Sequence, residues 1–217
     1  MNQERAYLYG AFLGDGFISN QGNSWYLALK VVDHDFADEF ERCLRVVYPY
    51  KHVSRYMADK AVGNRRARTQ VKINGKEIYM EFKENTNSKS EIPKFILDDV
   101  ALWPAFLRGI MDSEGWVTVG LNKKKTMMSF NVAFAMKAPF VGKLADMFNK
   151  VGATVVSDKT KDDLRTIIFH PLDYLKSGVS FSIVRKRKRL ELIAITLNDF
   201  TQRYSAIKYH GEVEDKV

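Results

Sequence analysis

One short segment of the chain occurs twice. Residues 6–18 (AYLYGAFLGDGFI) return as residues 105–117 (AFLRGIMDSEGWV) at a constant offset of 99 positions. Asp15 of the first copy corresponds to Glu114 of the second, and each acid is followed by a glycine. A segment repeated at this spacing is typical of two copies of one folding unit. The chain is therefore expected to fold as two similar halves.

The hydrophobic pattern predicts the same order of elements in both halves: helix, two strands, helix, two strands, helix. We place the first half at residues 1–84, a linker rich in Asn, Ser and Lys at 85–101, and the second half at 102–217. The expected fold class is α+β. The expected helices cover residues 7–15, 35–48, 77–83, 139–151, 171–176 and 184–197, and the expected strands cover residues 17–20, 24–32, 52–58, 66–74, 115–121, 129–135, 153–158 and 165–169.

Small side chains form a stripe along each repeated helix. They recur at every fourth position, which places them on one helix face. Glycine inside a helix costs roughly 0.5–1 kcal/mol relative to alanine, and the close approach of another helix backbone would offset that cost. Because both copies carry the stripe, we expect the two helices to pack against each other. The stripes are Ala6, Gly10 and Gly14 in the first copy and Ala105, Gly109 and Ser113 in the second.

An acid stands at the end of each repeated helix. Asp15 and Glu114 are expected in the last turn, before Gly16 and Gly115, which suit the left-handed residue that ends a helix. A carboxylate there faces the negative end of the helix dipole, at a cost of roughly 0.3–1 kcal/mol. If the helices pack along their small stripes, the two carboxylates meet, and a divalent cation would relieve their repulsion. The plainer alternative is two ordinary exposed acids beside helix-stopping glycines.

Charge and composition restrict the class of function. A net charge of +8 favours association with a polyanion, most commonly nucleic acid. All apolar runs are shorter than the ~18 residues needed to span a bilayer. Cys43 is the only cysteine, so an internal disulfide is excluded, and the N-terminal segment lacks the layout of a signal peptide. We expect a cytoplasmic protein, or one of an organellar matrix if the host is eukaryotic, without membrane association.

Residues 8–16 (LYGAFLGDG) and 107–115 (LRGIMDSEG) resemble the two motifs of monomeric LAGLIDADG homing endonucleases. Residues 92–96 (IPKFI), which lead into the second motif, are also typical of this family, and the resemblance covers nearly the whole chain. It implies motif helices packed about a pseudo-twofold axis and one four-stranded antiparallel sheet in each half. It further implies a monomer that sits like a saddle on double-stranded DNA and cuts both strands across the minor groove, leaving short 3′ overhangs.

The resemblance also implies the metal ligands. The family's metal-binding acids map onto Asp15 and Glu114, with Mg2+ as the expected cofactor and Mn2+ or Ca2+ able to occupy the same sites. The second acid position of the motif is Leu13 in the first copy and Asp112 in the second. That position varies in the family and is not normally a metal ligand, so we expect Asp112 to be a structural, hydrogen-bonding acid.

The family places lysines around the attacking waters, and two lysines match this pattern. Lys137 follows the second strand of the second half, and Lys186 resembles a lysine that enters the site before a late helix. We expect both to support catalysis; the alternative is that they contact only phosphate or solvent. In the first half the counterpart of Lys137 is Val32 or Asp33, which departs from the family pattern, and Lys30 is the substitute considered.

Polar and basic residues alternate with apolar ones in residues 66–74. Period-two alternation predicts a strand with one buried and one exposed face. The polar face carries Arg, suited to guanine, and Gln and Asn, suited to adenine, and it contains no acid, which favours DNA contact over a merely solvated face. Basic residues 123–125 and 185–189 are expected to contact phosphates. The predicted DNA-contacting residues are Arg66, Arg68, Gln70, Lys72 and Asn74, together with Ser19, Gln21, Asn23, Thr118, Asn122, Ser129 and Asn131, while Val117, Val119 and Leu121 are expected to face the core.

The proposed contacts differ between the halves, so the expected target is long and asymmetric. Two other functions remain open on the same scaffold: an RNA maturase with the host intron RNA as its partner, and a non-catalytic DNA-binding regulator. The presence of both acids favours cleavage, because a regulator would be expected to have lost at least one of them. The start at Met1 and the absence of a leading splicing cysteine favour an intron-encoded over an intein-encoded gene.

Overall fold

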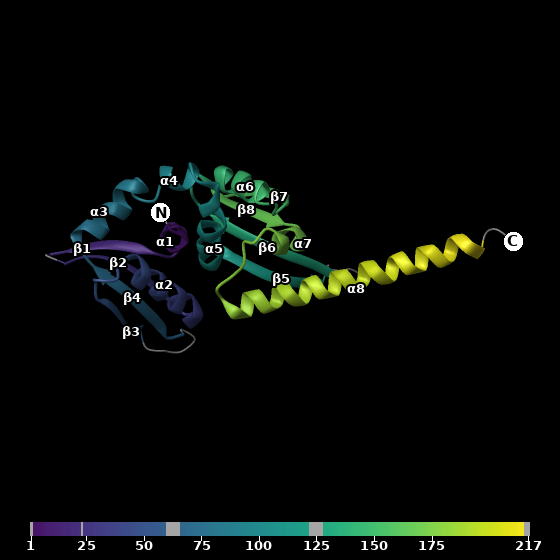
Figure 1. Cartoon of the computed structure of the whole chain (residues 1–217), viewed down its shortest axis with the longest axis horizontal. Coiled ribbons are helices and arrows are strands. Elements are labelled where there is room, and N and C mark those ends of the chain that lie inside the picture. Colours follow the sequence, from purple (N-terminus) through teal and green to yellow (C-terminus); the bar gives the residue numbers. More distant parts are fainter. Residues whose placement is uncertain (1, 23, 60–65, 122–127, 215–217) are drawn as a thin grey trace.

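The repeated segments form two helices that lie side by side at the centre of the molecule. The computed structural model describes residues 2–22, 24–59, 66–121 and 128–214, with side chains up to residue 199 except those of 121, 128 and 129. The central helices are α1 (Gln3–Leu13) and α5 (Trp103–Glu114), and one sheet lies on either side of them (Figure 1). The duplicated helices therefore form the boundary between the two halves.

The first half is built on a four-stranded antiparallel sheet with the strand order β1-β2-β4-β3. Helix α2 (His34–Val47) packs on this sheet and buries Phe36, Phe40 and Leu44, which have the helical spacing expected from the sequence. Helix α3 (Lys76–Asn85) follows the last strand. The strands are β1 (Phe17–Gln21), β2 (Ser24–Val31), β3 (Val53–Asp59) and β4 (Arg68–Asn74).

The second half repeats this architecture with the strand order β5-β6-β8-β7, again antiparallel throughout. The matching order confirms the predicted α+β fold with one four-stranded antiparallel sheet in each half. The strands are β5 (Gly115–Leu121), β6 (Met128–Met136), β7 (Val155–Lys161) and β8 (Leu164–Phe169), and the helices are α6 (Val141–Lys150), α7 (Pro171–Lys176) and α8 (Val184–Glu214).

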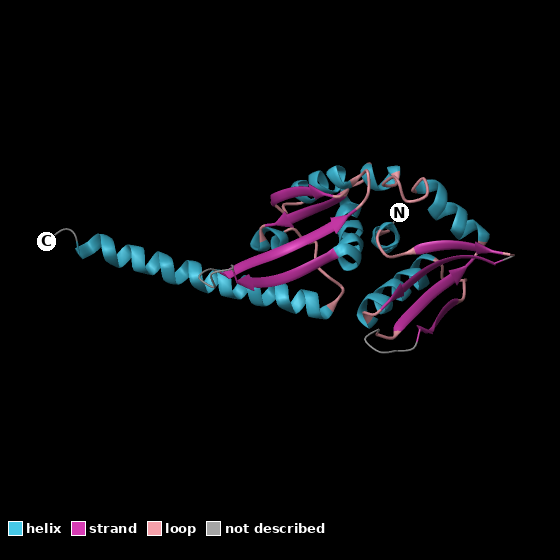
Figure 2. Cartoon of the chain, turned by 180° about the vertical axis from the view of Figure 1, so that it is seen from behind, coloured by secondary structure: helices cyan, strands magenta, loops and turns pink. Residues whose placement is uncertain are grey.

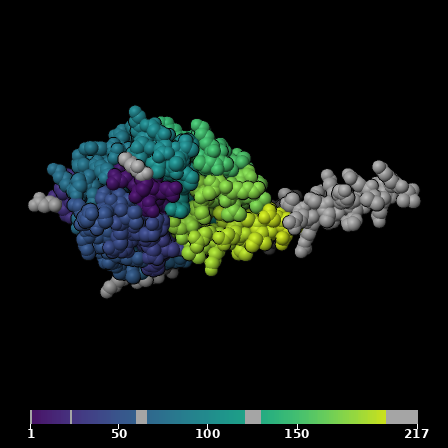
Figure 3. Space-filling view, viewed as in Figure 1, coloured from purple at the N-terminus to yellow at the C-terminus, as the bar shows by residue number. Residues whose placement is uncertain are grey.

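Helix α8 is longer than the hydrophobic pattern predicts. Its first turns pack on the second half through the buried Leu190 and Ile193, and the helix then projects away from the body (Figure 2). In the space-filling view, the first half (purple to blue) meets the second half (teal to green) along a broad boundary (Figure 3). Among the described helices, none is both long and apolar enough to cross a membrane.

The central helices approach each other through glycine, as the small stripes predict. A Cβ added at Gly10 would lie 2.0 Å from the carbonyl oxygen of Phe106, and one added at Gly109 would lie 2.4 Å from that of Tyr7. Further along the stripe, the Ser113 hydroxyl donates to the carbonyl oxygen of Ala11 at 3.4 Å. Because packed interiors leave no room for an extra carbon at these points, larger side chains would force the two backbones apart.

Helix α1 begins and ends earlier than predicted. The Asn2 side chain accepts a hydrogen bond from the backbone N–H of Arg5 at 3.0 Å, so this cap starts the helix at Gln3. The helix ends at Leu13, and Asp15 therefore lies just beyond it and not in its last turn.

The prediction that Gly16 and Gly115 are left-handed is wrong. Gly115 has a φ of −88°, and neither glycine has a positive φ. Their role is steric, because a Cβ at Gly16 would lie 2.6 Å from Cα of Phe12, and one at Gly115 would lie 2.5 Å from the carbonyl oxygen of Met111. Directly after each acid the chain folds back against its own helix, and a side chain would prevent this.

The segment 85–101, expected to be a linker, is folded against both halves, because Phe95 meets the Tyr9 ring of α1 and Ile96 meets Trp103 of α5. It contains α4 (Lys94–Leu97) and the 3-10 helix η1 (Val100–Leu102). The indole N–H of Trp103 donates to the carbonyl oxygen of Ile96 at 2.7 Å in a buried hydrogen bond. This segment therefore has a defined position relative to α5.

Candidate active site and nucleic-acid interface

The acids of the two repeated motifs lie at the same end of the central helix pair. Asp15 follows the end of α1, and Glu114 is the last residue of α5. A Cβ added at Gly14 would lie 3.3 Å from Oε1 of Glu114, so the Glu114 side chain reaches the first half. The fold thus brings together the two acids that the repeat singles out.

The two carboxylates act on each other electrostatically. Desolvation raises the pKa of Glu114, and the charge of Asp15 raises it further, whereas Lys89 and Lys186 lower it. Desolvation also raises the pKa of Asp15, against the same two lysines. The Asp15 side chain is accessible to solvent, yet surrounding protein atoms displace part of the water from its carboxylate. Asp15 and Glu114, called the acidic pair below, therefore both lie within the electrostatic influence of Lys89 and Lys186.

Lys186, in the first turn of α8, is one of these cations. Its side chain is only 6% exposed, and its Nζ donates to the carbonyl oxygens of Met111 at 3.2 Å and Asp112 at 2.8 Å. Both carbonyls belong to the end of α5, where the negative end of the helix dipole favours a cation. Burial lowers the pKa of the Lys186 ammonium, and the charge of Asp112 opposes this effect.

Lys89 is the second cation, and the sequence-based reasoning misses it. Its Nζ donates to the carbonyl oxygens of Gly14 at 2.6 Å and Gly16 at 3.0 Å, so it binds the end of α1 much as Lys186 binds the end of α5. Burial lowers its pKa, whereas the charges of Glu114 and Asp15 raise it. A signal for Lys89 does exist in the sequence: it precedes Lys186 by 97 positions, close to the 99-position offset of the motifs.

A cavity of about 310 Å³ opens beside Glu114. Glu114 and Gly14 line it at the helix ends, Lys89 lines it from the segment after α3, and Lys137 lines it from the end of β6. Lys137 is exposed, so a ligand in the cavity could reach it. The structure thus places Lys137 close to Glu114, on the side of the second half.

The first half carries an acid where the second carries Lys137. Asp33 accepts two hydrogen bonds from the guanidinium of Arg185, at 2.9 and 2.8 Å, which hold the pKa of this carboxyl below its ordinary value. Lys30, considered as the substitute, pairs with Asp59 at 3.1 Å. The two sides of the site therefore differ in charge.

The basic cluster 185–189 is only partly available for phosphate contact. Arg185 is paired with Asp33 across the two halves, and Lys186 is buried against α5. The remaining residues of the cluster, Arg187, Lys188 and Arg189, are exposed.

Asp112 is buried and holds several elements together. It is 2% exposed and accepts hydrogen bonds from the Tyr7 hydroxyl at 2.8 Å and from the backbone N–H of Ser182 at 2.9 Å. Burial raises the pKa of the Asp112 carboxyl to about 6, although these hydrogen bonds lower it. The acid joins α1 to the segment that leads into α8, and so it fixes the helix from which Lys186 projects.

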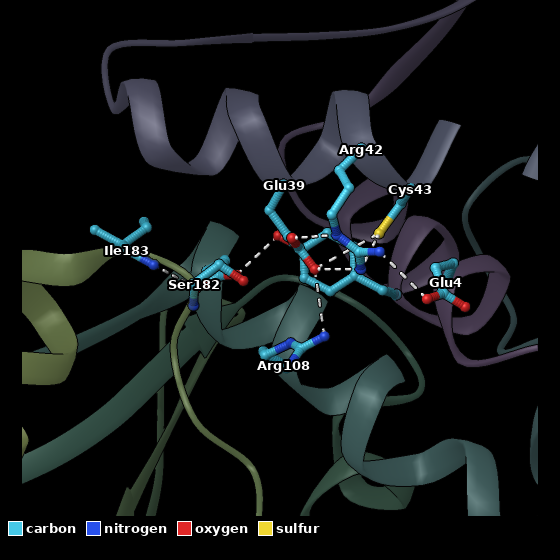
Figure 4. A network of polar contacts seen from close by, with 9 residues as sticks. Glu4, Glu39, Arg42, Cys43, Arg108, Ser182 and Ile183 are labelled. Carbon is cyan, nitrogen blue, oxygen red and sulfur yellow. Dashed lines mark hydrogen bonds and ion pairs between the residues drawn. The ribbon is translucent and has the colours of Figure 1, made fainter. Parts of the chain in front are cut away.

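A polar network crosses the boundary between the halves near Ser182 (Figure 4). Arg42 of α2 donates to Glu39 at 2.8 Å and to Glu4 of α1 at 3.3 Å. Arg108 of α5 donates to the same Glu39 at 3.4 Å, and the thiol of Cys43 donates to it at 3.7 Å. Burial raises the pKa of the Cys43 thiol, which keeps it protonated. Because Glu39 and Arg108 belong to different halves, this network helps to set how the halves sit together.

The acidic pair fits a hard divalent cation. One carboxylate stands just beyond the end of α1 and the other in the last turn of α5, and a cation would relieve the repulsion by Asp15 that, in addition to desolvation, raises the pKa of Glu114. Among the described residues, no group of three or more His, Cys, Asp or Glu side chains is arranged to hold an ion. The two carboxylates would thus supply part of a coordination shell, with water and phosphate oxygens completing it, as is common for Mg2+.

The outer face of the first sheet, which faces away from α2, carries many of the predicted DNA contacts. In β4, Thr69, Val71 and Ile73 turn inward and are buried, which confirms the predicted alternation. On the opposite face, Nζ of Lys72 lies 5.2 Å and 5.9 Å from the ring centres of Tyr26 and Tyr56. The sheet therefore presents a cation held between two aromatic rings.

Two residues of this face are less accessible than predicted. Gln70 is only 8% exposed, and Lys30 and Tyr56 stand opposite it on the neighbouring strands. Arg68 is exposed, but its Nε donates to Oδ2 of Asp59 at 2.6 Å. Asp59 comes from β3, so the expectation of a face without acids holds for β4 and fails for the assembled sheet.

The other predicted contacts are spread over both sheets. Ser19 pairs with Tyr26, which pairs with Asn74, and Gln21 pairs with Ser24, so Ser19, Gln21 and Asn74 lie on one face. Arg66 is exposed and precedes β4. In the second half, the exposed Thr118 pairs with Asn131. Asn23, Asn122 and residues 123–125 lie outside the described residues, as does the side chain of Ser129.

One expectation about the second sheet is only half right. Val117 is 2% exposed and faces the core, but Val119 is 52% exposed because it lies toward the end of the strand. The side chain of Leu121 lies outside the described residues.

Several solved structures of LAGLIDADG proteins share this architecture. The homing endonuclease I-DmoI, in complex with DNA and Mn, has a TM-score of 0.57 to this chain at 13% identity, covering 82% of this chain and 97% of I-DmoI. The chain has the two-motif LAGLIDADG fold. The homing endonuclease I-WcaI, bound to its DNA recognition sequence, matches with a TM-score of 0.54 at 17% identity over 82% of this chain and 80% of its own. The N-terminal LAGLIDADG domain of DUF199/WhiA matches with a TM-score of 0.53 at 14% identity over 82% of each chain.

Two uncharacterized proteins of Methanocaldococcus jannaschii are similar in sequence. One is 27% identical over 200 residues, which cover 87% of this chain and 70% of the relative. The other is 30% identical over 124 residues, which cover 57% of this chain and 44% of the relative. No family model matches the sequence. At 13–17% identity the LAGLIDADG likeness concerns the fold, and the activity has to be argued from the site.

Proposed function

We propose that this chain is a site-specific DNA endonuclease that uses Mg2+ to cut both strands of a long, asymmetric target, leaving short 3′ overhangs, and that it acts as a monomer. The observation that carries the proposal is the acidic pair, which lies between Lys89 and Lys186 at the junction of the two halves. The likeness of the fold to I-DmoI in complex with DNA and Mn, and to I-WcaI bound to its recognition sequence, supports it.

Each charged group has a role in this proposal. Asp15 and Glu114 would hold the divalent cation, which supplies positive charge that activates water and stabilises the leaving oxygen. Lys89 and Lys186 are fixed on the helix-end carbonyls, and from there they orient the carboxylates and offset the charge of the scissile phosphate. Lys137 meets the phosphate from the cavity on the side of the second half.

The outer face of the first sheet is proposed to read one part of the target. Ser19, Gln21 and Asn74 carry groups that can bond base edges, while Lys72 and Arg66 offer charge to phosphates. The second sheet contributes Thr118 and Asn131. Since the two sets differ, the two ends of the target should differ as well.

Cleavage of a randomised DNA library tests the proposal. The full chain is incubated with the library and Mg2+, and the new ends are sequenced. We expect one set of long, non-palindromic sequences cut in both strands, and no cutting once EDTA has removed the metal. RNA binding without DNA cutting would favour a maturase, and DNA binding without metal-dependent cutting would favour a regulator; either result contradicts the proposal.

Replacing Asp59 by Asn is expected to raise the affinity for non-specific DNA. Asp59 neutralises Lys30 and Arg68 on the outer face of the first sheet. The two released cations are then free to contact phosphates. Each further phosphate contact steepens the fall of log affinity with log salt concentration by roughly 0.9. Titrations of the D59N variant with a DNA duplex at several salt concentrations measure the affinity and this slope.

Asp158→Asn is the matched control. Asp158 forms the corresponding β-sheet ion pair with Arg165 in the second half, but that guanidinium lies beside Gly142 of α6 and so away from the outer face. This variant should bind DNA like the unchanged protein. Equal affinity of D59N and the unchanged protein at low salt would show that Lys30 and Arg68 do not meet DNA.

A further inference from the structure

We propose that Thr86 is a positioning residue that holds a left-handed turn at residues 87–89, which presents the Lys89 ammonium to the acidic pair. Asn87, Ser88 and Lys89 have φ values of 44°, 55° and 72°. Successive residues with side chains rarely adopt this conformation, because Cβ then crowds the backbone. Such a turn persists only where its surroundings hold it. The placement of Lys89 follows from the geometry alone, and its effect on cleavage rests on the proposed function.

Thr86 is the centre of the hydrogen bonds around this turn. It is fully buried, and its hydroxyl donates to the carbonyl oxygen of Phe82 at 2.7 Å while accepting from the backbone N–H of Lys89 at 3.1 Å. Its carbonyl oxygen accepts from the N–H groups of Ser90 and Glu91, both at 2.9 Å. One side chain therefore links the last turn of α3 to the backbone of Lys89.

The turn determines where the Lys89 side chain goes. After α3 the chain reverses within three residues, and the Lys89 ammonium then reaches the carbonyl oxygens of Gly14 and Gly16 beside the acidic pair. In the second half the corresponding lysine is positioned differently. Lys186 projects from the first turn of an ordinary helix that begins at Val184. The first half has no helix at this point, so the placement of its lysine depends on the turn and on Thr86.

Removal of the Thr86 hydroxyl should therefore release Lys89. Valine has nearly the shape of threonine but leaves the Lys89 N–H without its acceptor in a partly buried setting, which favours another backbone conformation. Serine keeps the hydroxyl. Thr86→Val and Thr86→Ser are thus a matched pair that separates the hydrogen bond from the packing.

The first measurement is Mg2+-dependent cleavage of the target under saturating enzyme. We expect Thr86→Val to slow cleavage about 10- to 100-fold, the range seen when a reacting group is slightly misplaced, while DNA affinity in Ca2+ stays unchanged and Thr86→Ser restores the rate. In a Lys89→Met background, Thr86→Val should have no further effect on the rate, because no ammonium group remains for Thr86 to position. The effects of the two substitutions are then not additive. A purely structural role for Thr86 would instead slow cleavage in both backgrounds.

The second measurement needs no cleavage. Acetylation of individual lysines, followed by mass spectrometry, reports how accessible each ammonium group is. We expect Lys89 to be protected in the unchanged protein and in Thr86→Ser, and to react several-fold faster in Thr86→Val, while Lys186 stays protected in all three. Ser88→Gly is the control, since glycine accepts the same φ, and it should keep both Lys89 protection and cleavage.

The two measurements separate the failure of this inference from that of the proposed function. If the unchanged protein cuts no DNA, the nuclease assignment fails and the acetylation pattern alone decides the role of Thr86. Equal Lys89 reactivity in Thr86→Val and the unchanged protein would overturn the positioning role. Equal cleavage rates in these two proteins would overturn it as well.

Discussion

Replacing Asp15 by Asn, or Glu114 by Gln, is expected to leave DNA bound but uncut. Each change removes one charge from the acidic pair while keeping the shape of the side chain, so the cation loses a ligand. Loss of electrostatic stabilisation of this kind typically costs at least about 100-fold in rate. Binding should be unchanged or slightly tighter, because a carboxylate near the phosphates repels them. Cleavage in Mg2+ and binding in Ca2+, both measured on the selected target, give the two quantities.

Glu84→Gln serves as the control for these variants. Glu84 is an exposed acid at the end of α3, and its replacement changes the net charge by the same amount. It should cut DNA at the normal rate. Full activity in either D15N or E114Q would remove the metal-binding role from that residue, and a loss of DNA binding in either would show that the acid serves folding or recognition.

Replacing Gly10 by Ala is expected to destabilise the whole protein. The added carbon would lie 2.0 Å from the carbonyl oxygen of Phe106, a backbone atom that can move away only if the two central helices separate. Overpacking of an interior costs typically about 1–3 kcal/mol, and this contact lies at the upper end because neither partner is a flexible side chain. Urea denaturation should show a lower free energy of unfolding by about 3 kcal/mol or a protein that does not fold.

Gly142→Ala is the matched control, because Gly142 is also a helical glycine, in the first turn of α6. A Cβ there would meet only the guanidinium tip of Arg165 at 3.0 Å, and a flexible side chain can shift. The change should be neutral or stabilising by up to about 1 kcal/mol, the usual difference between alanine and glycine in a helix. Similar free energies of unfolding for G10A and the unchanged protein would contradict the close helix packing.

The architecture could be predicted because it depends on local periodicity and on a repeat. The 99-position offset implies two similar halves, and the small residues at every fourth position imply that the helices meet. Both inferences concern neighbours on one helix or copies of one segment. The glycines after the acids show the limit of such reasoning: residue type indicates that a side chain is not tolerated, but it does not tell a left-handed turn from close contact with the preceding helix.

The site could be predicted only in part, because its remaining features are contacts between distant segments. Arg68 and Lys30 meet Asp59 from another strand, and Arg185 meets Asp33 from the other half. None of these pairs follows from spacing along the chain. Lys89 is missed for a different reason. Its turn has left-handed backbone but contains no glycine that would indicate this in the sequence, and the segment has the composition of a plain linker.

The contacts at the start of α8 restrict how such a protein can be re-engineered. The backbone N–H of Val184 donates to Asp35 at 2.6 Å and Arg185 binds Asp33, so the first half anchors the helix that delivers a lysine to the second. A chimera that joins a foreign N-terminal module to residues 102–217 would lose this anchor, even if the close contact of Gly10 and Gly109 between the central helices were kept. Designers who exchange modules to reach new recognition sequences would therefore need to transplant these two aspartates together with the glycine contact.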